Sequence, residues 1–337
     1  FEFACPMSTE GGLQRQFYEM LMDSQWWSAD QLRNHQRSQL SQLLHHAKAN
    51  VPFYEHRLDA VLMPSGDIDW NRWRDIPIVR RQDLAEHRSA IQATQVPPGH
   101  GATESYRSSG STGTPIEITV NGLVTLVNTA LRWRYHSWNS LSWAEPMVIW
   151  QLDAQASPGG IVPLGPWGPK WSPESTGVSW GVGKDIDTET MASFLTDSRS
   201  AYVNRGPKAM HVFALDCERL GLRPSFDAIL CQGEACDESD REAFHRVFGA
   251  RAVELYSAKE SGHIAHPCEH GSLHLAEEAI FVELLNEAGD PCEVGETGDV
   301  TVTPLYFTAQ PVIRYQLGDM AEYAPPCACG RKSRVLG

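Results

Sequence analysis

Two hydrophobic patterns alternate along the chain. Apolar residues spaced three and four apart are typical of amphipathic helices, and they predict helices over 28–50, 122–138, 189–195, 208–220 and 237–248. Strict alternation or short apolar runs are typical of strands, and they predict strands over 116–120, 147–150, 228–231 and 252–256. Because these strands are separated by helices, the pattern predicts a mostly parallel sheet whose carboxyl ends face a ligand.

The first predicted helix has clear boundary signals. Ser28 and Gln31 form a capping box at its start, and Pro52 ends it. By contrast, residues 157–183 are rich in Gly, Pro and Trp, so we expect a surface loop that borders a site.

The pattern changes after Ala279. Short apolar runs separated by Gly and Pro turns predict an antiparallel β subdomain with strands over 281–285, 299–303, 311–315 and 320–323. We therefore expect an α/β fold with layers of mostly parallel sheet flanked by helices, followed by this subdomain. The expected parts are a cloning remnant at 1–6, a helical part at 7–100, an α/β core at 101–278 and the antiparallel subdomain at 279–337.

Composition narrows the classes of partner. The 337 residues include 28 Lys and Arg against 42 Asp and Glu, which gives a net charge of −14 without any Lys/Arg-rich run. A nucleic-acid or anionic-membrane partner is therefore not expected. No apolar run approaches the roughly 20 residues of a membrane span, and the N-terminus lacks a signal pattern, so we expect a cytoplasmic protein.

The stretch from Tyr106 to Val120 combines hydroxyls and glycines in a loop that leads into a strand. Glycines let backbone N–H groups approach an anion, and hydroxyls add uncharged donors, so the loop is a candidate phosphate site. A flexible linker is the alternative, but the alternating strand after Pro115 argues that the loop is anchored to a sheet. The candidate residues are Ser108, Ser109, Gly110, Ser111, Thr112, Gly113 and Thr114.

Three stretches in this order, 108–115, 256–260 and 313–319, resemble the motifs of the adenylate-forming superfamily of acyl-CoA synthetases and adenylation domains. The likeness is greatest to the branch of phenylacetate-coenzyme A ligase, coenzyme F390 synthetase and capsule-biosynthesis proteins. Segments 50–54, 233–235 and 325–331 are also similar to that branch. The resemblance covers nearly the whole chain and assigns nucleotide and acid binding to 101–278.

The resemblance implies specific roles. The 108–114 loop would hold the β- and γ-phosphates of ATP, and Gly233, Glu234 and Ala235 would line the adenine site. Tyr256 would stack on the adenine, Glu260 would hold Mg²⁺, and Asp319 would accept bonds from both ribose hydroxyls. Taken alone, Glu260 also fits a helix cap or sheet edge, and Asp319 also fits a turn.

The implied reaction joins a small carboxylic acid to ATP as an acyl adenylate, with loss of pyrophosphate, before a thiol, usually of coenzyme A, displaces AMP. Two departures bear on it. The related loops carry a lysine where this chain has Thr114, and Lys259 stands where Ser or Thr is usual. Our hypothesis is that Lys259 supplies the missing charge beside Glu260. A salt bridge to Glu260 or a solvated lysine is the alternative.

Eight cysteines in a chain of this character indicate thiols or a metal site rather than a disulfide framework. Cys327 and Cys329 suit a turn that presents two thiolates to one metal, and a third thiol and two imidazoles lie upstream. The combination resembles the structural zinc site of some phenylacetate-ligase relatives, which implies Cys268, His274, Cys327 and Cys329 as ligands. His270 is a substitute candidate, and reduced surface thiols are the alternative.

The acid-binding pocket is the least specified part. In similar proteins, the region after the phosphate loop helps to line it, which makes Trp133, Tyr135, Trp138 and Trp150 candidates. Eleven tryptophans favour an aromatic acid, although tryptophans also serve as core.

The resemblance also bears on the chain's end. Similar proteins continue after a stretch like 334–337 into a mobile lid of about 100 residues, so we expect ATP binding with weak adenylation from a truncated or naturally lidless chain. The alternative functions are transfer to a carrier protein or a nitrogen nucleophile, and a catalytically incomplete nucleotide- or zinc-binding module. The sequence does not decide whether the chain forms a homodimer.

Overall fold

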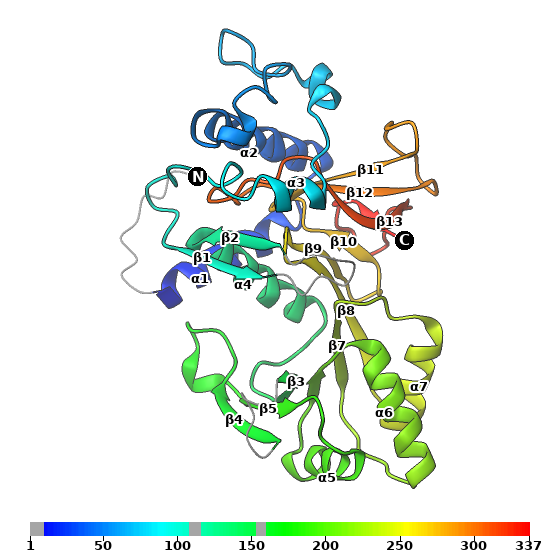
Figure 1. The fold of residues 1–337 in the computed structure, drawn as a ribbon. Helices are drawn as coiled ribbons and strands as arrows, with labels where there is room; N and C mark the ends of the chain where they lie inside the picture. The colour runs from blue at the N-terminus through cyan, green and yellow to red at the C-terminus, as the bar shows by residue number, and fades with distance from the viewer. Residues whose placement is uncertain (1–9, 108–115, 153–159) are drawn as a thin grey trace. The chain divides into compact units, whose positions relative to one another are not determined.

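The structure, a computed structural model, describes residues 10–107, 116–152 and 160–337 (Figure 1). These residues divide into two compact units. The first unit contains Tyr135–Tyr256 and the described residues up to Gln16, and the second contains Phe17–Arg134 and Ser257–Gly337. Among the described residues, no helix combines the length and the apolar character that crossing a membrane requires.

The first unit is built on a mostly parallel sheet, which confirms the predicted α/β class. Its strand order is β8-β7-β6-β3-β5-β4, and only the edge strand β4 runs antiparallel to its neighbour. The strands are β3 (Met147–Leu152), β4 (Ile161–Pro166), β5 (Val178–Gly183), β6 (Tyr202–Asn204), β7 (Ala228–Gln232) and β8 (Arg251–Ala258).

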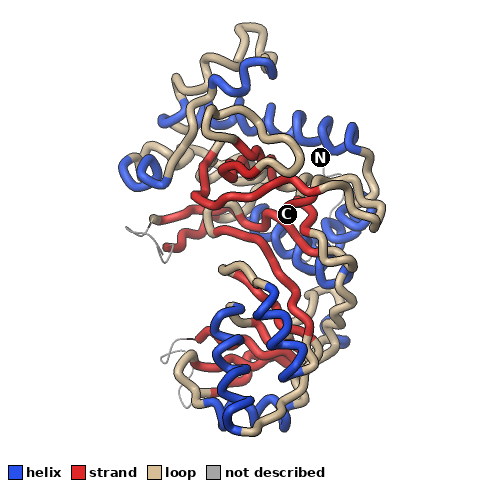
Figure 2. The backbone as a smooth tube through the Cα atoms, turned by 90° about the vertical axis from the view of Figure 1, so that its right-hand side faces the viewer, coloured by secondary structure: helices blue, strands red, loops and turns tan. Residues whose placement is uncertain are grey.

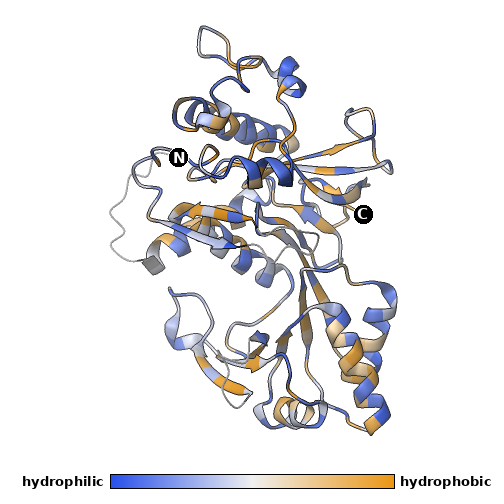
Figure 3. Ribbon diagram, viewed as in Figure 1, coloured by the Kyte–Doolittle hydropathy of each residue, from blue (hydrophilic) through white to orange (hydrophobic). Residues whose placement is uncertain are grey.

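Three helices pack on this sheet: α5 (Thr188–Ser198), α6 (Pro207–Leu220) and α7 (Glu238–Phe248). Phe213 of α6 and Phe248 of α7 stack with ring centroids 5.5 Å apart and join a buried cluster with Ile229 of β7. Figures 1 and 2 show α6 and α7 side by side against the strands, and Figure 3 shows that both helices mix hydrophobic and hydrophilic residues.

The opposite face of the sheet is buried as well. Ala228 and Leu230 of β7 pack there with Tyr135 and Tyr202, while Ile229 faces the helices. Burial on both faces explains why the central strands read as continuous apolar runs in the sequence.

The expectation of a loop over 157–183 was wrong within the described part of that range. Residues 161–166 and 178–183 are the paired strands β4 and β5, with the 3₁₀ helix η3 (Pro173–Ser175) between them. β5 pairs in parallel with β3, which places it inside the sheet. Its glycines misled the pattern analysis, because Gly181 and Gly183 are strand residues here rather than turn residues.

The second unit contains an antiparallel sheet of order β11-β12-β13-β14-β10-β9 and a separate hairpin of β1 and β2. The strands are β1 (Thr103–Arg107), β2 (Glu117–Asn121), β9 (Gly262–Pro267), β10 (Leu273–Leu275), β11 (Ile280–Leu285), β12 (Thr297–Pro304), β13 (Tyr315–Ala324) and β14 (Val335–Leu336). The predicted antiparallel region is confirmed. The separate strand over 311–315 is not, because β13 begins only at Tyr315.

The predicted helices over 28–50 and 122–138 are confirmed as α2 and α4, whereas α1 was not among the predicted helices. Ser28 caps α2 through the predicted capping box, and α2 ends at Asn50 before Pro52. The remaining elements are α1 (Glu10–Ser24), α2 (Ala29–Asn50), η1 (Pro52–Tyr54), η2 (Trp70–Asp75), α3 (Arg81–Glu86) and α4 (Gly122–Trp138). The chain passes between the units within α1, α4 and β8.

A buried carboxylate connects several of these helices. Glu278, between β10 and β11, accepts a bond of 2.6 Å from Arg134 of α4 and one of 2.8 Å from Ser24 of α1. The Nε2 atom of His35 in α2 lies 3.0 Å from the Glu278 carbonyl oxygen. The Arg134 and Glu278 side chains are only 1% and 8% exposed. Burial acts to raise the pKa of Glu278, but the Arg134 cation and the hydrogen bonds from Arg134, the Glu278 backbone and Ser24 together lower it.

We predict that Arg134→Met destabilises the second unit by about 3–5 kcal/mol, because it leaves a buried carboxylate without its cation. Urea unfolding measures this loss. Arg134→Met/Glu278→Leu should recover most of it, since no charge then remains buried. Arg246→Met, which removes an exposed ion pair with Glu218, should cost less than about 1 kcal/mol.

The pH dependence follows from the lowered pKa of Glu278. The ion pair stabilises the fold above the ordinary carboxyl pKa of 4.5, and this contribution is lost as pH falls below it. The difference in unfolding free energy between wild type and Arg134→Met should therefore shrink on acidification. A difference that stays constant from pH 7 to pH 4 would contradict the assignment.

Candidate functional site

In the first unit, candidate residues follow the carboxyl end of β7. Gly233 has φ of +85°, a left-handed conformation that suits glycine and turns the chain out of the sheet. Glu234 and Ala235 come next and are exposed. Tyr256 lies near the end of the neighbouring parallel strand β8 and is half-buried. The carboxyl ends of adjacent parallel strands meet at one edge of the sheet, which is where ligands of such sheets bind.

The turn after β6 lies beside this segment. A Cβ added to Gly206 would stand 3.7 Å from Oε2 of Glu234. Next to it, the Arg205 guanidinium lies over the Trp150 ring at 5.2 Å and donates to the Trp150 carbonyl at 2.6 Å. Burial lowers the pKa of Arg205, and the charge of Glu234 acts in the opposite direction. The Gly233–Ala235 segment therefore has a cation nearby.

The same edge carries three linked amides that the sequence analysis missed. Asn204 Oδ1 accepts bonds from Gln151 Nε2 at 2.5 Å and from Gln232 Nε2 at 3.0 Å. Asn204 and Gln232 are the last residues of β6 and β7, and Gln151 is the last but one of β3. The sequence signal was present, because a polar residue follows an apolar run in all three strands.

In the second unit, Glu260 is held in place by an arginine. Its Oε1 accepts a bond of 2.9 Å from Arg81 at the start of α3, and its side chain is 11% exposed. Among the described residues, the ion pair of Glu260 is with Arg81 and none joins it to Lys259, so the alternative of a salt bridge between Lys259 and Glu260 is not observed. No motif in the sequence pointed to Arg81, since it lies 179 residues away along the chain.

Lys259 lies next to the end of β1. Its ammonium donates to the Arg107 carbonyl at 3.2 Å, and the Tyr106 hydroxyl donates to the Lys259 carbonyl at 2.8 Å. Burial and the nearby Glu260 carboxylate raise the pKa of Tyr106 to about 12, so the hydroxyl keeps its proton at neutral pH. Lys259 and Glu260 are thus fixed beside the last residue before the candidate phosphate loop.

The loop residues themselves, Ser108, Ser109, Gly110, Ser111, Thr112, Gly113 and Thr114, lie outside the described residues. Their flanks are paired: β1 and β2 are antiparallel, and Arg107 stands opposite Glu117. The segment between them is therefore anchored at both ends in a hairpin, as the alternating strand predicted.

Asp319 belongs to the same unit. It is exposed in β13, four residues after the buried Tyr315. Burial raises the pKa of Tyr315, and the charges of Glu260 and Asp319 raise it further, while Arg81 lowers it. Both carboxylates therefore affect the same phenol.

The four aromatic candidates for the acid pocket are all deeply buried. Trp133, Tyr135, Trp138 and Trp150 are 3%, 4%, 6% and 6% exposed. Trp150 packs edge-on against Phe213 at 5.0 Å and donates to the Gly183 carbonyl at 3.0 Å.

The four predicted zinc ligands converge in the second unit. The ligand atoms of Cys268, His274, Cys327 and Cys329 all lie within 4.8 Å of one another. Sγ of Cys268 is 3.6 Å from Sγ of Cys327, and Sγ of Cys329 is 3.2 Å from Nε2 of His274. A tetrahedral zinc ion with Zn–S bonds near 2.3 Å separates two sulfurs by about 3.8 Å, so the spacing fits.

Backbone groups support the thiolates. The His270 N–H donates to Cys268 Sγ and the Cys329 N–H donates to Cys327 Sγ, both at 3.4 Å. His270 thus contributes its backbone, and its side chain is outside the four-residue cluster. Nδ1 of His274 lies 3.1 Å from the Ser333 hydroxyl, which orients Nε2 toward the sulfurs.

The pKa shifts of these ligands differ in direction. Burial lowers the pKa of His274 to about 4, so its imidazole is neutral at pH 7. Burial raises the pKa of Cys268 to about 11, whereas at Cys327 burial is outweighed by hydrogen bonds from Ser272 and Cys329, and the pKa is lowered. Three soft sulfurs and one imidazole are the ligands that zinc prefers.

Comparison with curated proteins identifies relatives along nearly the whole chain. The chain is 24% identical over 324 residues to the phenylacetate-coenzyme A ligase of Thermus thermophilus, covering 91% of this chain and 69% of the relative. It is 25% identical over 335 residues to the enzyme of the same name from Escherichia coli, with coverage of 92% and 72%. No protein-family model matches the chain.

Solved structures agree on the fold. An open conformation of 2-hydroxyisobutyryl-CoA ligase in complex with 2-HIB-AMP and CoA superimposes with a TM-score of 0.70 at 17% identity, covering 89% of this chain and 72% of that one. The same ligase in its thioesterification state gives a TM-score of 0.72 at 18% identity, with coverage of 93% and 70%. At this level of identity, the likeness establishes the architecture.

Proposed function

The chain is a relative of the phenylacetate-coenzyme A ligases and has the fold of adenylate-forming acyl-CoA ligases, and we propose that it activates a carboxylic acid with ATP. The carboxylate oxygen attacks the α-phosphorus, pyrophosphate leaves, and an acyl adenylate forms. A thiol, that of coenzyme A in our proposal, then displaces AMP to give the thioester. The observation that carries the proposal is the match to a phenylacetate-coenzyme A ligase that covers 91% of this chain.

The chain's residues divide the work of holding ATP. The 108–114 loop would hold the β- and γ-phosphates, and Gly233, Glu234 and Ala235 the adenine, with Tyr256 stacked on the ring. Asp319 is exposed, which suits a carboxylate that accepts two bonds from ribose hydroxyls.

Glu260 would hold Mg²⁺, which when bound neutralises charge on the phosphates. Arg81 bonds to Oε1 of Glu260 and fixes the side chain, so the second carboxylate oxygen is the atom that would bind the ion. Such pre-orientation lets the carboxylate meet a hard cation without reorganising.

The acid is proposed to be aromatic, with Trp133, Tyr135, Trp138 and Trp150 near its site. Two observations support this class: the names of the curated relatives and the aromatic content of α4 and β3. Transfer of the acyl group to a carrier protein is the second candidate for the later step, because the first half-reaction is the same for either acceptor.

Pyrophosphate exchange tests the proposed activation of a carboxylic acid. The chain should catalyse pyrophosphate exchange into ATP in the presence of an acid that it activates, and a panel of aryl and alkyl acids that includes phenylacetate identifies that acid. Glu260→Gln should lower the exchange rate by about 10²-fold, because a neutral amide binds Mg²⁺ poorly. Glu287→Gln, an exposed carboxylate in the turn after β11, is the matched control. Absence of exchange with every acid would favour a nucleotide- or zinc-binding module.

Lys259 gives a second prediction. Since its ammonium is held 3.2 Å from the carbonyl that precedes the candidate phosphate loop, we expect Lys259→Ala to raise the KM for ATP about tenfold. Arg246→Ala, which removes an exposed cation from α7, should leave that KM unchanged. A Lys259→Ala enzyme with wild-type KM and rate would eliminate the idea that Lys259 replaces the loop lysine.

We also propose that Cys268, His274, Cys327 and Cys329 hold one structural zinc ion. Protein purified without chelator should contain about one zinc per chain by elemental analysis. Cys329→Ser should abolish that content and lower the unfolding temperature by roughly 5–10 °C, because metal binding adds to folding free energy. Cys217→Ser, a buried thiol outside the cluster, should keep the zinc. Full metal-free stability in the wild type would refute the site.

A further inference from the structure

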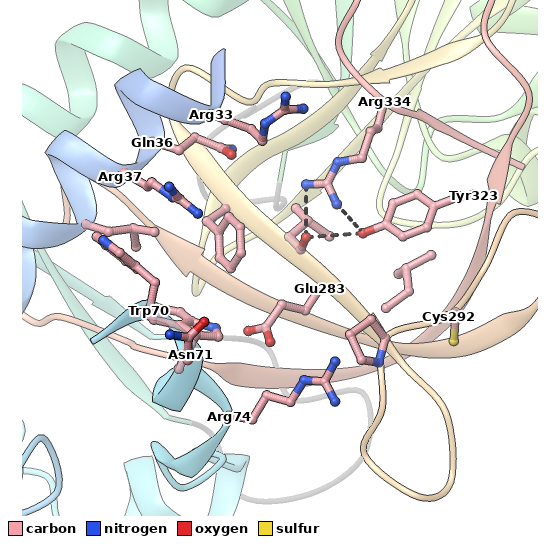
Figure 4. A pocket seen from close by; sticks show the side chains of 16 residues that line it. Arg33, Gln36, Arg37, Trp70, Asn71, Arg74, Glu283, Cys292, Tyr323 and Arg334 are labelled. Carbon is pink, nitrogen blue, oxygen red and sulfur yellow. Dashed lines mark hydrogen bonds between the residues drawn. The ribbon is translucent and has the colours of Figure 1, made fainter. Parts of the chain in front are cut away.

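A cavity of about 670 Å³ opens in the second unit between α2, η2, β11 and β13. None of the residues proposed above for ATP, the acid or zinc lines it. Figure 4 shows side chains from these elements converging on it: Arg33 and Arg37 from α2, Arg74 from η2, and Arg334 from the segment before β14. Its volume lies within the range of small-molecule sites.

The lining is strongly cationic. Four of its sixteen residues are arginines, and Glu283 is its single carboxylate. That carboxylate is already neutralised, because its Oε2 accepts a bond of 3.1 Å from Arg314, and both side chains are buried. Arg314 in turn donates to the carbonyls of Arg74 and Ile76 at 2.8 Å. The Arg314–Glu283 pair therefore stabilises the wall of the cavity. The four lining arginines provide the charge that a ligand would contact.

Three of the arginines are able to turn toward a ligand. Within the described residues, the recorded contact of Arg37 is with the Trp70 ring, at 5.7 Å, and no carboxylate is bonded to it. Arg33 pairs with Asp30, and Arg74 pairs with Asp290 at 2.6 Å, but all four side chains are more than half exposed. Exposed pairs of this kind contribute little to stability and exchange readily for a phosphate.

The fourth arginine is fixed. Arg334 donates to Glu277 at 2.6 Å, to the Tyr323 hydroxyl at 2.6 Å and to the Val282 carbonyl at 3.1 Å. Figure 4 shows Arg334 and Tyr323 at the side of the cavity opposite Arg37. One wall is therefore preorganised, while the wall formed by α2 and η2 is adjustable.

The cavity also offers flat apolar surface. Trp70 and Trp73 lie with ring centroids 6.2 Å apart at an angle of 31°, and Leu40, Phe281 and Pro291 complete the apolar lining. The indole N–H of Trp73 is buried and has no acceptor among the described residues. A guanidinium over a tryptophan face beside apolar side chains is an arrangement that accommodates a planar ring.

We propose that this cavity binds a phosphorylated anion that carries a planar ring. Arg33, Arg37 and Arg74 would bind the phosphates, and Trp70 would stack on the ring. Two sources have this chemistry: coenzyme A, whose presence as a ligand rests on the proposed function, and a free adenine nucleotide acting as an effector. Bidentate guanidinium bonds suit phosphate oxygens in either source.

Isothermal titration calorimetry of the 337-residue chain tests the proposal with coenzyme A, ATP, adenosine and inorganic pyrophosphate as separate probes. Arg37→Gln and Arg74→Gln should each weaken binding of the preferred nucleotide about tenfold or more. The matched control is Arg72→Gln, which removes a neighbouring exposed cation on η2 that does not line the cavity, and it should change the affinity less than about twofold. Adenosine should bind weakly because it lacks the phosphates.

The arms of the experiment separate the sources. Sensitivity of coenzyme A binding to Arg37→Gln assigns the cavity to the acyl acceptor, whereas sensitivity of ATP binding alone assigns it to an effector. Equal losses in Arg72→Gln and Arg74→Gln, or nucleotide affinities unchanged by both cavity variants, would overturn the proposal. Pyrophosphate exchange is measured separately. Loss of exchange with retained nucleotide binding in the cavity would contradict the proposed function alone. Retained exchange without nucleotide binding in the cavity would contradict the cavity assignment alone.

Discussion

The second unit depends on one buried charge, the carboxylate of Glu278. That carboxylate accepts bonds from Ser24 of α1 and Arg134 of α4, and the backbone carbonyl of the same residue lies 3.0 Å from Nε2 of His35 in α2, so three helices meet at the junction of β10 and β11. Bonds of this kind are directional, so they specify which helix faces the sheet at which height, whereas apolar packing alone tolerates sliding. Because α4 begins directly after β2, the same carboxylate indirectly holds the hairpin that flanks the candidate phosphate loop.

Local sequence signals were sufficient to predict an element when the residues of that element alone determine its boundaries. The α2 boundaries follow from Ser28, Gln31 and Pro52, and the bounds of α4 from its helical periodicity. The strand β5 was missed because its stability comes from pairing with β3 and β4, while its own glycines resemble a turn. The three-residue strand β6 was missed because so short a segment shows no period.

The candidate sites also divide into residues that a local sequence motif identifies and residues that only the fold brings together. The resemblance implied Cys268, His274, Cys327 and Cys329 as one ligand set, and the ligand atoms of these residues lie within 4.8 Å of one another. Arg81 belongs to no such motif, because its relation to Glu260 arises only when α3 packs near the start of β9. The arginine cavity is likewise invisible in sequence, since Arg37, Arg74 and Arg334 come from three distant segments and each reads as an ordinary surface cation.

The order of the proposed zinc ligands along the chain has a consequence for synthesis on the ribosome. Cys268 and His274 emerge first, and Cys327 and Cys329 follow only after β11, β12 and β13 have been made. An ion held early by two ligands has its coordination completed only when this antiparallel segment has left the exit tunnel. Binding of the ion by all four ligands would therefore require that β11, β12 and β13 have been synthesised. A chain whose translation stops before Cys327 would offer only two of the four ligands.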